Sequence, residues 1–349
     1  MNAKRIAVLY AVAAAALYAV NVPISKLLLE QIGPTMLEAF LYLGAGVGLF
    51  LYGAVSRAVG TAAPAEPLTR KELPYTVAMV VLDIIAPILL MLGIRASNAA
   101  NVSLINNFEI VATSIIALVV FKEAISRRLW IAIALVTAAS VILTFEGAGV
   151  FAFNIGSLFV FGACLCWGFE NNCTKMISNK SSVEIVVIKG TFSGLGSLAV
   201  ALAVGEEIPA LRWILCALLL GFVAYGLSIH FYIMAQKDLG AAKTSAYYAI
   251  APFLGVAFGM LILGERPGLQ FYAALLVMIV STCFMIKDTF ELQHAHPHTH
   301  THTHAHSHGE LVHTHEHTHT HTHTHTHGGD TGNHDHRHRR LSHEHLHAC

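Results

Sequence analysis

The sequence predicts an all-α membrane protein of about ten transmembrane helices, built as two inverted five-helix repeats and followed by a disordered C-terminal tail. Three observations lead to this prediction: a low charge content, a series of long apolar runs, and a weak internal repeat. Of the 349 residues, 55% are hydrophobic and only 12% are charged, whereas a soluble domain carries about 25% charged residues. Such a deficit is typical of a protein whose outer surface faces lipid.

The apolar runs are long enough to be transmembrane helices, because a helix of about 20 apolar residues spans a bilayer. The first run follows Lys4-Arg5 as a secretory signal would, but it continues through Asn21 and Pro23 to Lys26. We therefore interpret it as the first helix. The predicted helices cover residues 6–29, 34–56, 74–94, 99–121, 127–145, 155–175, 183–204, 212–235, 241–263 and 268–286.

The loops predict an orientation, since Lys and Arg are more frequent on the cytoplasmic side of a membrane protein. The other side would hold mainly Arg95, Arg212 and Arg266. We therefore expect both termini in the cytoplasm, as an even number of helices requires. The residues that would then be cytoplasmic are Lys4, Arg5, Arg57, Arg70, Lys71, Lys122, Arg127, Arg128, Lys180, Lys237, Lys243 and Lys287.

The two halves of the apolar region repeat each other weakly. Residues 18–26 align with residues 167–175, since each stretch begins with an aromatic residue and ends with a hydroxyl residue followed by Lys. Residues 99–103 align likewise with residues 241–245. An odd number of helices per half inverts the second half, and transporters of this plan bind substrate between the halves. We expect one repeat over 1–146, the other over 147–288, and the tail over 289–349.

These motifs resemble those of the drug/metabolite transporter superfamily, specifically ten-helix proteins with two EamA repeats, over about residues 5–287. The resemblance implies export or uptake of small metabolites without ATP, and the sequence has no Walker-type phosphate-binding loop. The first half departs from the pattern, with Tyr18-Ala19 in place of Trp-Gly and Glu109-Ile110 in place of Ala-Pro, so no substrate is implied. The motifs that carry the resemblance are Trp167-Gly168, Lys175, the small residues that begin the helices at 99 and 241, Ala251-Pro252 and Leu263-Gly264-Glu265.

Ionisable side chains inside the predicted helices are candidates for a substrate and coupling site, because charge in a membrane is costly. A buried carboxylate disfavours its charged form and can take up a proton near the working pH. Exchange of that proton would then drive substrate movement. The candidates are Asp83, Glu109, Glu170, Lys189 and His230, with Asn106 and Asn107 beside Glu109.

A structural role is the alternative for each of these groups, which can pair with one another or with the backbone. Lys189 lies close enough to its helix end to snorkel, and His230 can be a satisfied packing residue. Prolines inside the spans predict kinks that line a cavity or act as hinges, at Pro23, Pro87 and Pro252. Glycines four residues apart predict close helix contacts, at Gly44–Gly48, Gly190–Gly194 and Gly255–Gly259.

The tail is rich in histidine, with 22 of the 23 His in the last 58 residues, most of them alternating with Thr. It lacks the apolar content for a core and is expected to be disordered. Neutral imidazole is a common metal ligand, and alternation puts every second side chain on one face of an extended chain. We predict binding of Zn²⁺, Ni²⁺ or Co²⁺; a neutral repeat expansion and a pH-sensing tail are the alternatives. The predicted ligands are His294, His296, His298, His300, His302, His304, His306, His308, His313, His315, His317, His319, His321, His323, His325 and His327.

Two functions compete on this evidence. The first is a secondary carrier, an exporter of small metabolites, whose tail chelates metal; the second is a transition-metal exporter fed by the tail, or a membrane-bound metal store or sensor. The spans lack paired metal ligands one helical turn apart, which favours the first. We expect a small-molecule substrate, a lipid bilayer and tail-bound divalent ions as partners, no required cofactor and no nucleic acid, and the sequence is compatible with a homodimer. No nucleophile and base stand together as an enzyme would need.

Overall fold

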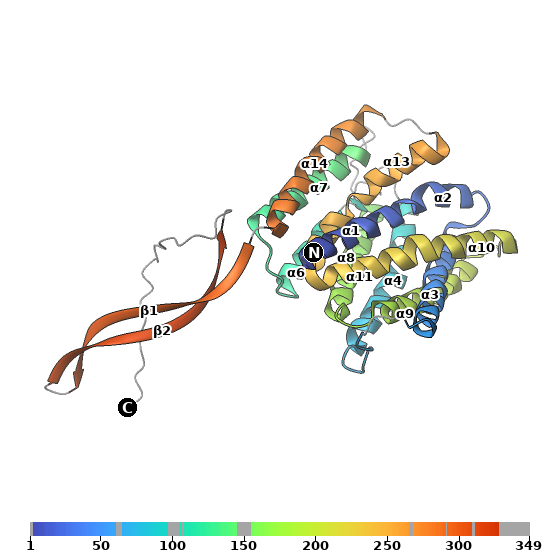
Figure 1. Cartoon of the computed structure of the whole chain (residues 1–349). Helices are drawn as coiled ribbons and strands as arrows, with labels where there is room; N and C mark the ends of the chain where they lie inside the picture. The colour runs from blue at the N-terminus through green and yellow to red at the C-terminus, as the bar shows by residue number, and fades with distance from the viewer. Residues whose placement is uncertain are drawn as a thin grey trace. The chain divides into compact units, whose positions relative to one another are not determined.

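The structure, a computed structural model, describes residues 3–60, 65–96, 105–106, 108–144, 155–264, 268–290, 292–308 and 311–327. The chain divides into two compact units, residues 1–289 and 290–349. The helices of the first unit (Figure 1) are α1 Ala3–Ala19, α2 Asn21–Leu28, α3 Pro34–Ala58, α4 Leu73–Ala96, α6 Phe108–Val119, α7 Arg127–Thr144, α8 Ile155–Ile177, α9 Ser182–Ala203, α10 Leu211–Leu220, the π-helix η1 Gly221–Leu227, α11 Ser228–Leu239, α12 Ala241–Tyr248, α13 Ala251–Leu263 and α14 Leu269–Phe290.

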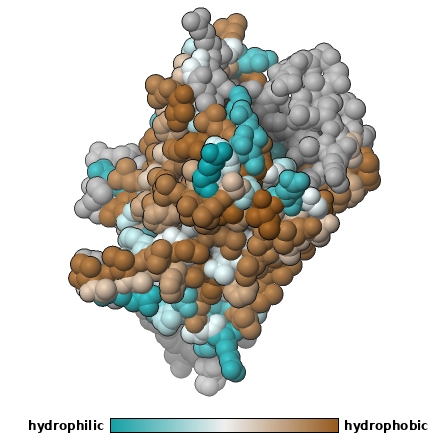
Figure 2. Space-filling model, turned by 90° about the vertical axis from the view of Figure 1, so that its right-hand side faces the viewer, coloured by the Kyte–Doolittle hydropathy of each residue, from teal (hydrophilic) through white to brown (hydrophobic). Residues whose placement is uncertain are grey.

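Within the residues that the structure describes, seven helical segments are long and apolar enough to cross a membrane, which confirms the predicted membrane class. The other three predicted spans correspond to α6, α7 and α8, and for these the total of ten stays a prediction. Large apolar side chains cover the outer surface, as Figure 2 shows for one face; Leu261 is 80% exposed and Leu269 is 85% exposed. Such a surface suits contact with lipid chains. The seven segments are Ala3–Leu28, Pro34–Ala58, Leu73–Leu90, Ser182–Ala203, Leu211–Leu239, Ala241–Ile262 and Leu269–Thr289.

The most extensive helix contacts join one half of the helical unit to the other. α3 packs against α9, α4 against α8, α1 against α11, and α6 against α8. In the repeat, α8 is the counterpart of α1, α11 is the counterpart of α4, and α12 with α13 is the counterpart of α6. The α4–α8 contact therefore corresponds to the α11–α1 contact. The α6–α8 contact corresponds in the same way to the contacts of α12 and α13 with α1. The contacts therefore follow the two-fold relation that the inverted repeat predicts.

Glycines let the backbones of the central helices approach closely. A Cβ at Gly190 of α9 would lie 2.4 Å from the backbone nitrogen of Gly46 of α3, and one at Gly44 would lie 2.2 Å from the carbonyl oxygen of Leu218. These approaches confirm the close contacts that the glycine spacing predicts at Gly44 and Gly190.

Hydrogen bonds join both ends of α9 to the first half of the chain. At the N-terminus of α3, the N–H groups of Thr35 and Met36 donate to the Glu206 carboxylate at 3.1 and 2.6 Å. At the other end of α9, the N–H of Leu68, in the segment that precedes α4, donates to the carboxylate of Glu184 in the first turn of α9 at 2.9 Å. Both ends tie the first half to the second.

A third carboxylate ties the halves together at the start of α12. The N–H groups of Ala241 and Ala242 donate to Glu123, which follows α6, at 3.0 and 3.3 Å. Gly240 precedes them with a φ of 82°, and a Cβ there would lie 2.4 Å from Glu123 Oε1. Glycine is therefore required here both for the left-handed conformation and for the space.

Two of the spans are interrupted, and a third contains a wider helical turn. The first breaks between α1 and α2, three residues before Pro23, and another breaks between α12 and α13, just before Pro252. The predicted kinks are thus found at these two prolines, whereas Pro87 lies inside an unbroken α4. The π-helix η1 lies within the span that runs from α10 to α11. Such irregular segments are frequent at functional sites.

The predicted disorder of the tail is not confirmed, because the structure describes two strands there. The tail contains an antiparallel two-stranded hairpin of β1 Leu292–His308 and β2 Leu311–His327. Alternating Thr explains the difference, because β-branched residues favour extended backbone and the alternation matches the period of a strand. The register opposes His to His at seven positions, for example His298 to His321. Residues opposed in an antiparallel pair share a face, so the hairpin brings His positions of both strands together.

Candidate functional site

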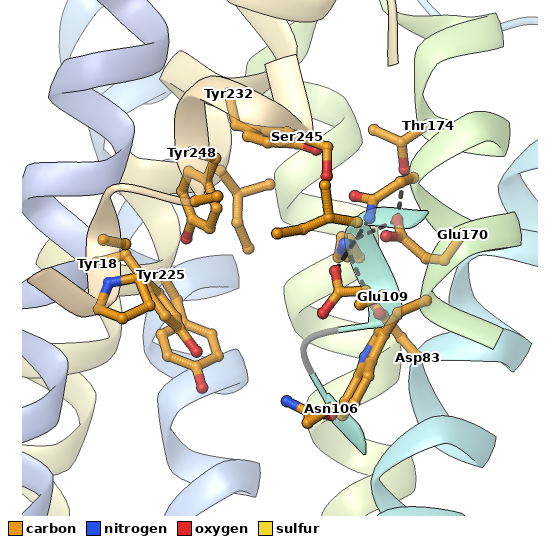
Figure 3. A pocket seen from close by; sticks show the side chains of 18 of the residues that line it. Tyr18, Asp83, Asn106, Glu109, Glu170, Thr174, Tyr225, Tyr232, Ser245 and Tyr248 are labelled. Carbon is orange, nitrogen blue, oxygen red and sulfur yellow. Dashed lines mark hydrogen bonds and ion pairs between the residues drawn. The ribbon is translucent and has the colours of Figure 1, made fainter. Parts of the chain in front are cut away.

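A cavity of about 390 Å³ lies between the two halves of the helical unit. Its size falls in the range of small-molecule sites. Figure 3 shows it from close by. Residues of both halves line it, including Tyr18, Glu38 and Glu109 from the first half and Glu170, Lys189 and Tyr225 from the second. The position between inverted halves is where the predicted plan places a substrate.

Three buried charged groups form an ion-paired cluster at one side of the cavity. Lys189 Nζ lies 3.1 Å from Asp83 Oδ2 and 2.8 Å from Glu170 Oε1. The three residues are 6%, 1% and 3% exposed, respectively. Thr174 also donates a hydrogen bond to Glu170 Oε1. One ammonium is thus shared by two carboxylates on α4 and α8, so the cluster joins both halves.

Glu109 of α6 lies beside this cluster with a neutral partner. Asn171 Nδ2 donates to Glu109 Oε1 at 3.2 Å and lies 3.3 Å from Thr113 Oγ1. Gln236 Nε2 donates to the main-chain carbonyl of Asn171 at 3.0 Å, which ties α11 to α8 at this point. Glu109 is half-buried and lines the cavity. It therefore faces the space that a substrate would occupy.

Glu38 of α3 is a lining carboxylate that the sequence analysis missed. The Tyr225 hydroxyl lies 3.2 Å from Glu38 Oε2 and 3.5 Å from Oε1, and donates to this carboxylate. Glu38 comes only four residues after Pro34, so the sequence alone suggests a charged residue at the membrane-surface end of this helix. The first turns of α3 are nevertheless packed among other helices, since Met36 and Leu37 are buried.

Five tyrosines line the cavity, and their rings contact one another. The ring centroids lie 5.7 Å apart for Tyr18 and Tyr225, 5.5 Å for Tyr18 and Tyr248, 5.3 Å for Tyr42 and Tyr225, and 5.1 Å for Tyr232 and Tyr248. Figure 3 shows Tyr18, Tyr225 and Tyr248 on the side opposite Glu109, Asp83 and Glu170. The cavity thus has an aromatic wall and an acidic wall.

The structure brings most of the predicted site residues together. Asp83, Asn106, Glu109, Glu170 and Lys189 all line the cavity, and Asn107 lies outside the described residues. Lys189 does not snorkel, because its ammonium is buried between two carboxylates. Whether these residues carry transport stays a prediction.

His230 of α11 lies apart from the cavity. It is not among the lining residues, and its ring packs near those of Tyr52 and Phe231, at 6.2 and 5.5 Å between centroids. Its Nδ1 is buried without a hydrogen-bond partner among the described residues, so a satisfied packing role is not what the structure shows, and a functional role for His230 stays a prediction.

A periodic signal in the sequence could have identified part of the aromatic wall. Tyr225, Ile229 and Tyr232 are four and three residues apart and all line the cavity. This is the spacing of one helix face. The repeat gave a second signal, because its two aromatic positions, Tyr18 and Trp167, both line the cavity.

Known proteins share this architecture. The model of the EamA-like transporter family matches residues 5–145 and 154–287. An uncharacterized transporter of Methanothermobacter thermautotrophicus is 24% identical over 265 residues, which cover 71% of this chain and 76% of that protein. A solved structure named only as the crystal structure of a protein is similar with a TM-score of 0.67 at 14% identity, over 80% of this chain and 95% of that one. This last similarity concerns the fold alone.

Proposed function

This chain belongs to the EamA-like transporter family, and we propose that it exports small metabolites in exchange for protons through the cavity between its halves. That it is a multi-pass membrane protein, a transporter of small molecules and not an enzyme follows from the family match over both repeats and from the transporter relative. The direction of transport, the coupling to protons and the role of the tail are the proposal.

The hydrogen bonding of Glu109 carries the proposed coupling. Asp83 and Glu170 share the Lys189 ammonium, so protonating either would break a buried ion pair. Glu109 accepts its hydrogen bond from a neutral amide, and its protonation leaves the ion pairs intact. A carboxylate that faces the cavity without a cation partner is the group best placed to exchange a proton with the entering solvent.

Liposomes containing the full-length protein and a trapped pH-sensitive dye test this proposal. We expect at least one compound from a panel of amino acids, amines and organic acids to move protons when applied on one side. Glu109→Gln keeps the size and hydrogen bonding of the side chain but removes its titration, and should abolish substrate-dependent proton movement. The matched control is Glu207→Gln, which makes the same change at an exposed position after α9. Proton-dependent flux that survives Glu109→Gln would contradict the proposal.

We also propose that the tail binds Zn²⁺, Ni²⁺ or Co²⁺ and adjusts transport without being required for it. The hairpin register supports this, because it opposes His to His at seven positions and imidazole is a common ligand of these metals. Binding should weaken below about pH 6.5, where histidine becomes protonated.

Comparing full-length protein with residues 1–291 separates this role from that of a metal exporter fed by the tail. Within the helical residues that the structure describes, no three His, Cys, Asp or Glu side chains are close enough to hold a metal ion, which favours the metabolite carrier. Truncation should therefore leave maximal metabolite flux intact and remove only its metal dependence. Loss of metal efflux on truncation, with no metabolite flux found, would favour the exporter.

A further inference from the structure

We infer that the substrate is an organic cation, with an ammonium group held by Glu109 on the acidic wall and an apolar body packed against the tyrosine wall, where Glu38 adds a second carboxylate. The inference rests on the proposed function of the cavity and names the chemical class that the cavity recognises.

The charges around the cavity point to a cation. Four carboxylates line it, at Glu38, Asp83, Glu109 and Glu170, and Lys189 is the one lysine or arginine among the lining residues. That ammonium already contacts two of the four carboxylates at 2.8 and 3.1 Å. Among the described lining residues, an anion would meet four carboxylates and no free cation, whereas an ammonium would meet two carboxylates, Glu38 and Glu109, whose described hydrogen-bond donors are neutral.

The tyrosine wall distinguishes an organic cation from a metal ion. Hard metal ions are held by several oxygen ligands at short distance, but Tyr18, Tyr42, Tyr225, Tyr232 and Tyr248 line the cavity as a contiguous group of rings. Aromatic faces attract ammonium groups, most strongly where water is excluded. A cavity of about 390 Å³ also has room for a ring or short chain beside the charge.

The same geometry links the cation to the proton. Glu109 can neutralise its charge either with a proton or with an ammonium, and one side chain cannot do both at once. The two ions therefore compete for it, and outward movement of one cation would be matched by inward movement of one proton. Such competition produces exchange without any further coupling group.

Calorimetric titration of the full-length protein in lipid nanodiscs tests the inference with three probes of similar shape. They are benzyltrimethylammonium, which is a permanent cation, 2-phenylethanol, which is neutral, and phenylacetate, which is an anion. We expect the cation to bind at least tenfold more tightly than the other two and to release a proton as it binds. Glu109→Gln should weaken cation binding at least tenfold, and Glu207→Gln should not change it.

Further variants keep the test decisive if Glu109→Gln fails to fold. Glu38→Gln removes the carboxylate on the tyrosine side, and Tyr18→Leu removes one ring; each should weaken binding of the cation more than that of 2-phenylethanol. Equal or tighter binding of phenylacetate would overturn the inference. If phenylacetate were also transported, the proposed transport function would hold, and only the inference of a cationic substrate would be wrong. Tight cation binding without flux of any probe in liposomes would leave this site in place and contradict the proposed function.

Discussion

At the scale of single residues, we expect Lys189 to stabilise the folded protein by neutralising the buried carboxylates beside the cavity. Lys189→Met removes the ammonium between Asp83 and Glu170 and leaves two buried carboxylates without a cation. Removing one partner of a buried pair costs about 3–5 kcal/mol. We expect a large loss of thermal stability in detergent, and recovery when Asp83→Asn and Glu170→Gln are added, because the uncharged groups no longer need a partner.

Lys180 provides the control for this variant. It also contacts two carboxylates, Glu66 at 2.9 Å and Glu72 at 3.6 Å, but in a loop region where the Glu66 side chain is 77% exposed. Lys180 lowers the pKa of Glu66 by its hydrogen bond and its charge. The small stabilisation from this shift is present above the ordinary pKa of Glu and is lost as the pH falls through the lowered value. Lys180→Met should change the melting temperature little at neutral pH. A similar loss in both variants would show that burial is not what makes Lys189 important.

The residues that sequence analysis found are those that stand out in an apolar run. Asp83, Glu109, Glu170 and Lys189 each interrupt such a run, so the cost of charge in a membrane was enough to select them. Glu38 was not identified, because a charged residue near the start of an apolar run is also expected at the membrane surface. The tyrosines of the cavity were not identified from the sequence, because a tyrosine does not stand out within an apolar run. Their role becomes visible only when the structure places them around one cavity.

At the scale of the helices, the α3–α9 contact depends on the absence of a side chain at Gly190. Gly→Ala inside a helix gains about 1 kcal/mol of helix propensity, but at Gly190 a methyl group would lie 2.4 Å from a backbone nitrogen that cannot move alone. We expect Gly190→Ala to lower the melting temperature. The matched control is Gly162→Ala in α8, where the methyl group would meet only the tip of the Leu89 side chain at 3.3 Å, and it should be neutral or stabilising. Equal stability of the two variants would contradict the close contact.

The elements could be predicted where hydropathy alone defines them. The apolar runs located the spans, and proline marked two of the interruptions. The π-helix η1 and the unbroken α4 around Pro87 were not predictable, because neighbouring helices decide whether a local irregularity forms. In the tail, low apolar content favours disorder, whereas the alternation of Thr and His matches the period of a strand, so composition and periodicity predict different structures.

At the scale of the whole molecule, two ion pairs join segments that the charge pattern predicts to lie on the same side of the membrane. Lys180 contacts Glu66, and Lys243 at the start of α12 contacts Asp288 at the end of α14 at 2.6 Å, so segments predicted to share a side lie together. The excess of Lys and Arg on that side predicts that it is cytoplasmic. An alkaline-phosphatase fusion after Lys287 should be inactive and a fluorescent-protein fusion there should be bright. The reverse result would mean a different helix count or the opposite orientation.

The pairing of one half with the other also has a consequence for how the chain is made. When residues 1–146 have left the ribosome, the surfaces that α1, α3 and α4 will pack against have not yet been synthesised. We therefore expect the helices of the first half to be only loosely associated in the bilayer at this stage, with the glycine face of α3 in contact with lipid. Assembly is completed only when α8, α9 and α11 arrive. A first half expressed alone should be recognised as unassembled and degraded, and supplying residues 147–349 as a separate chain should rescue it.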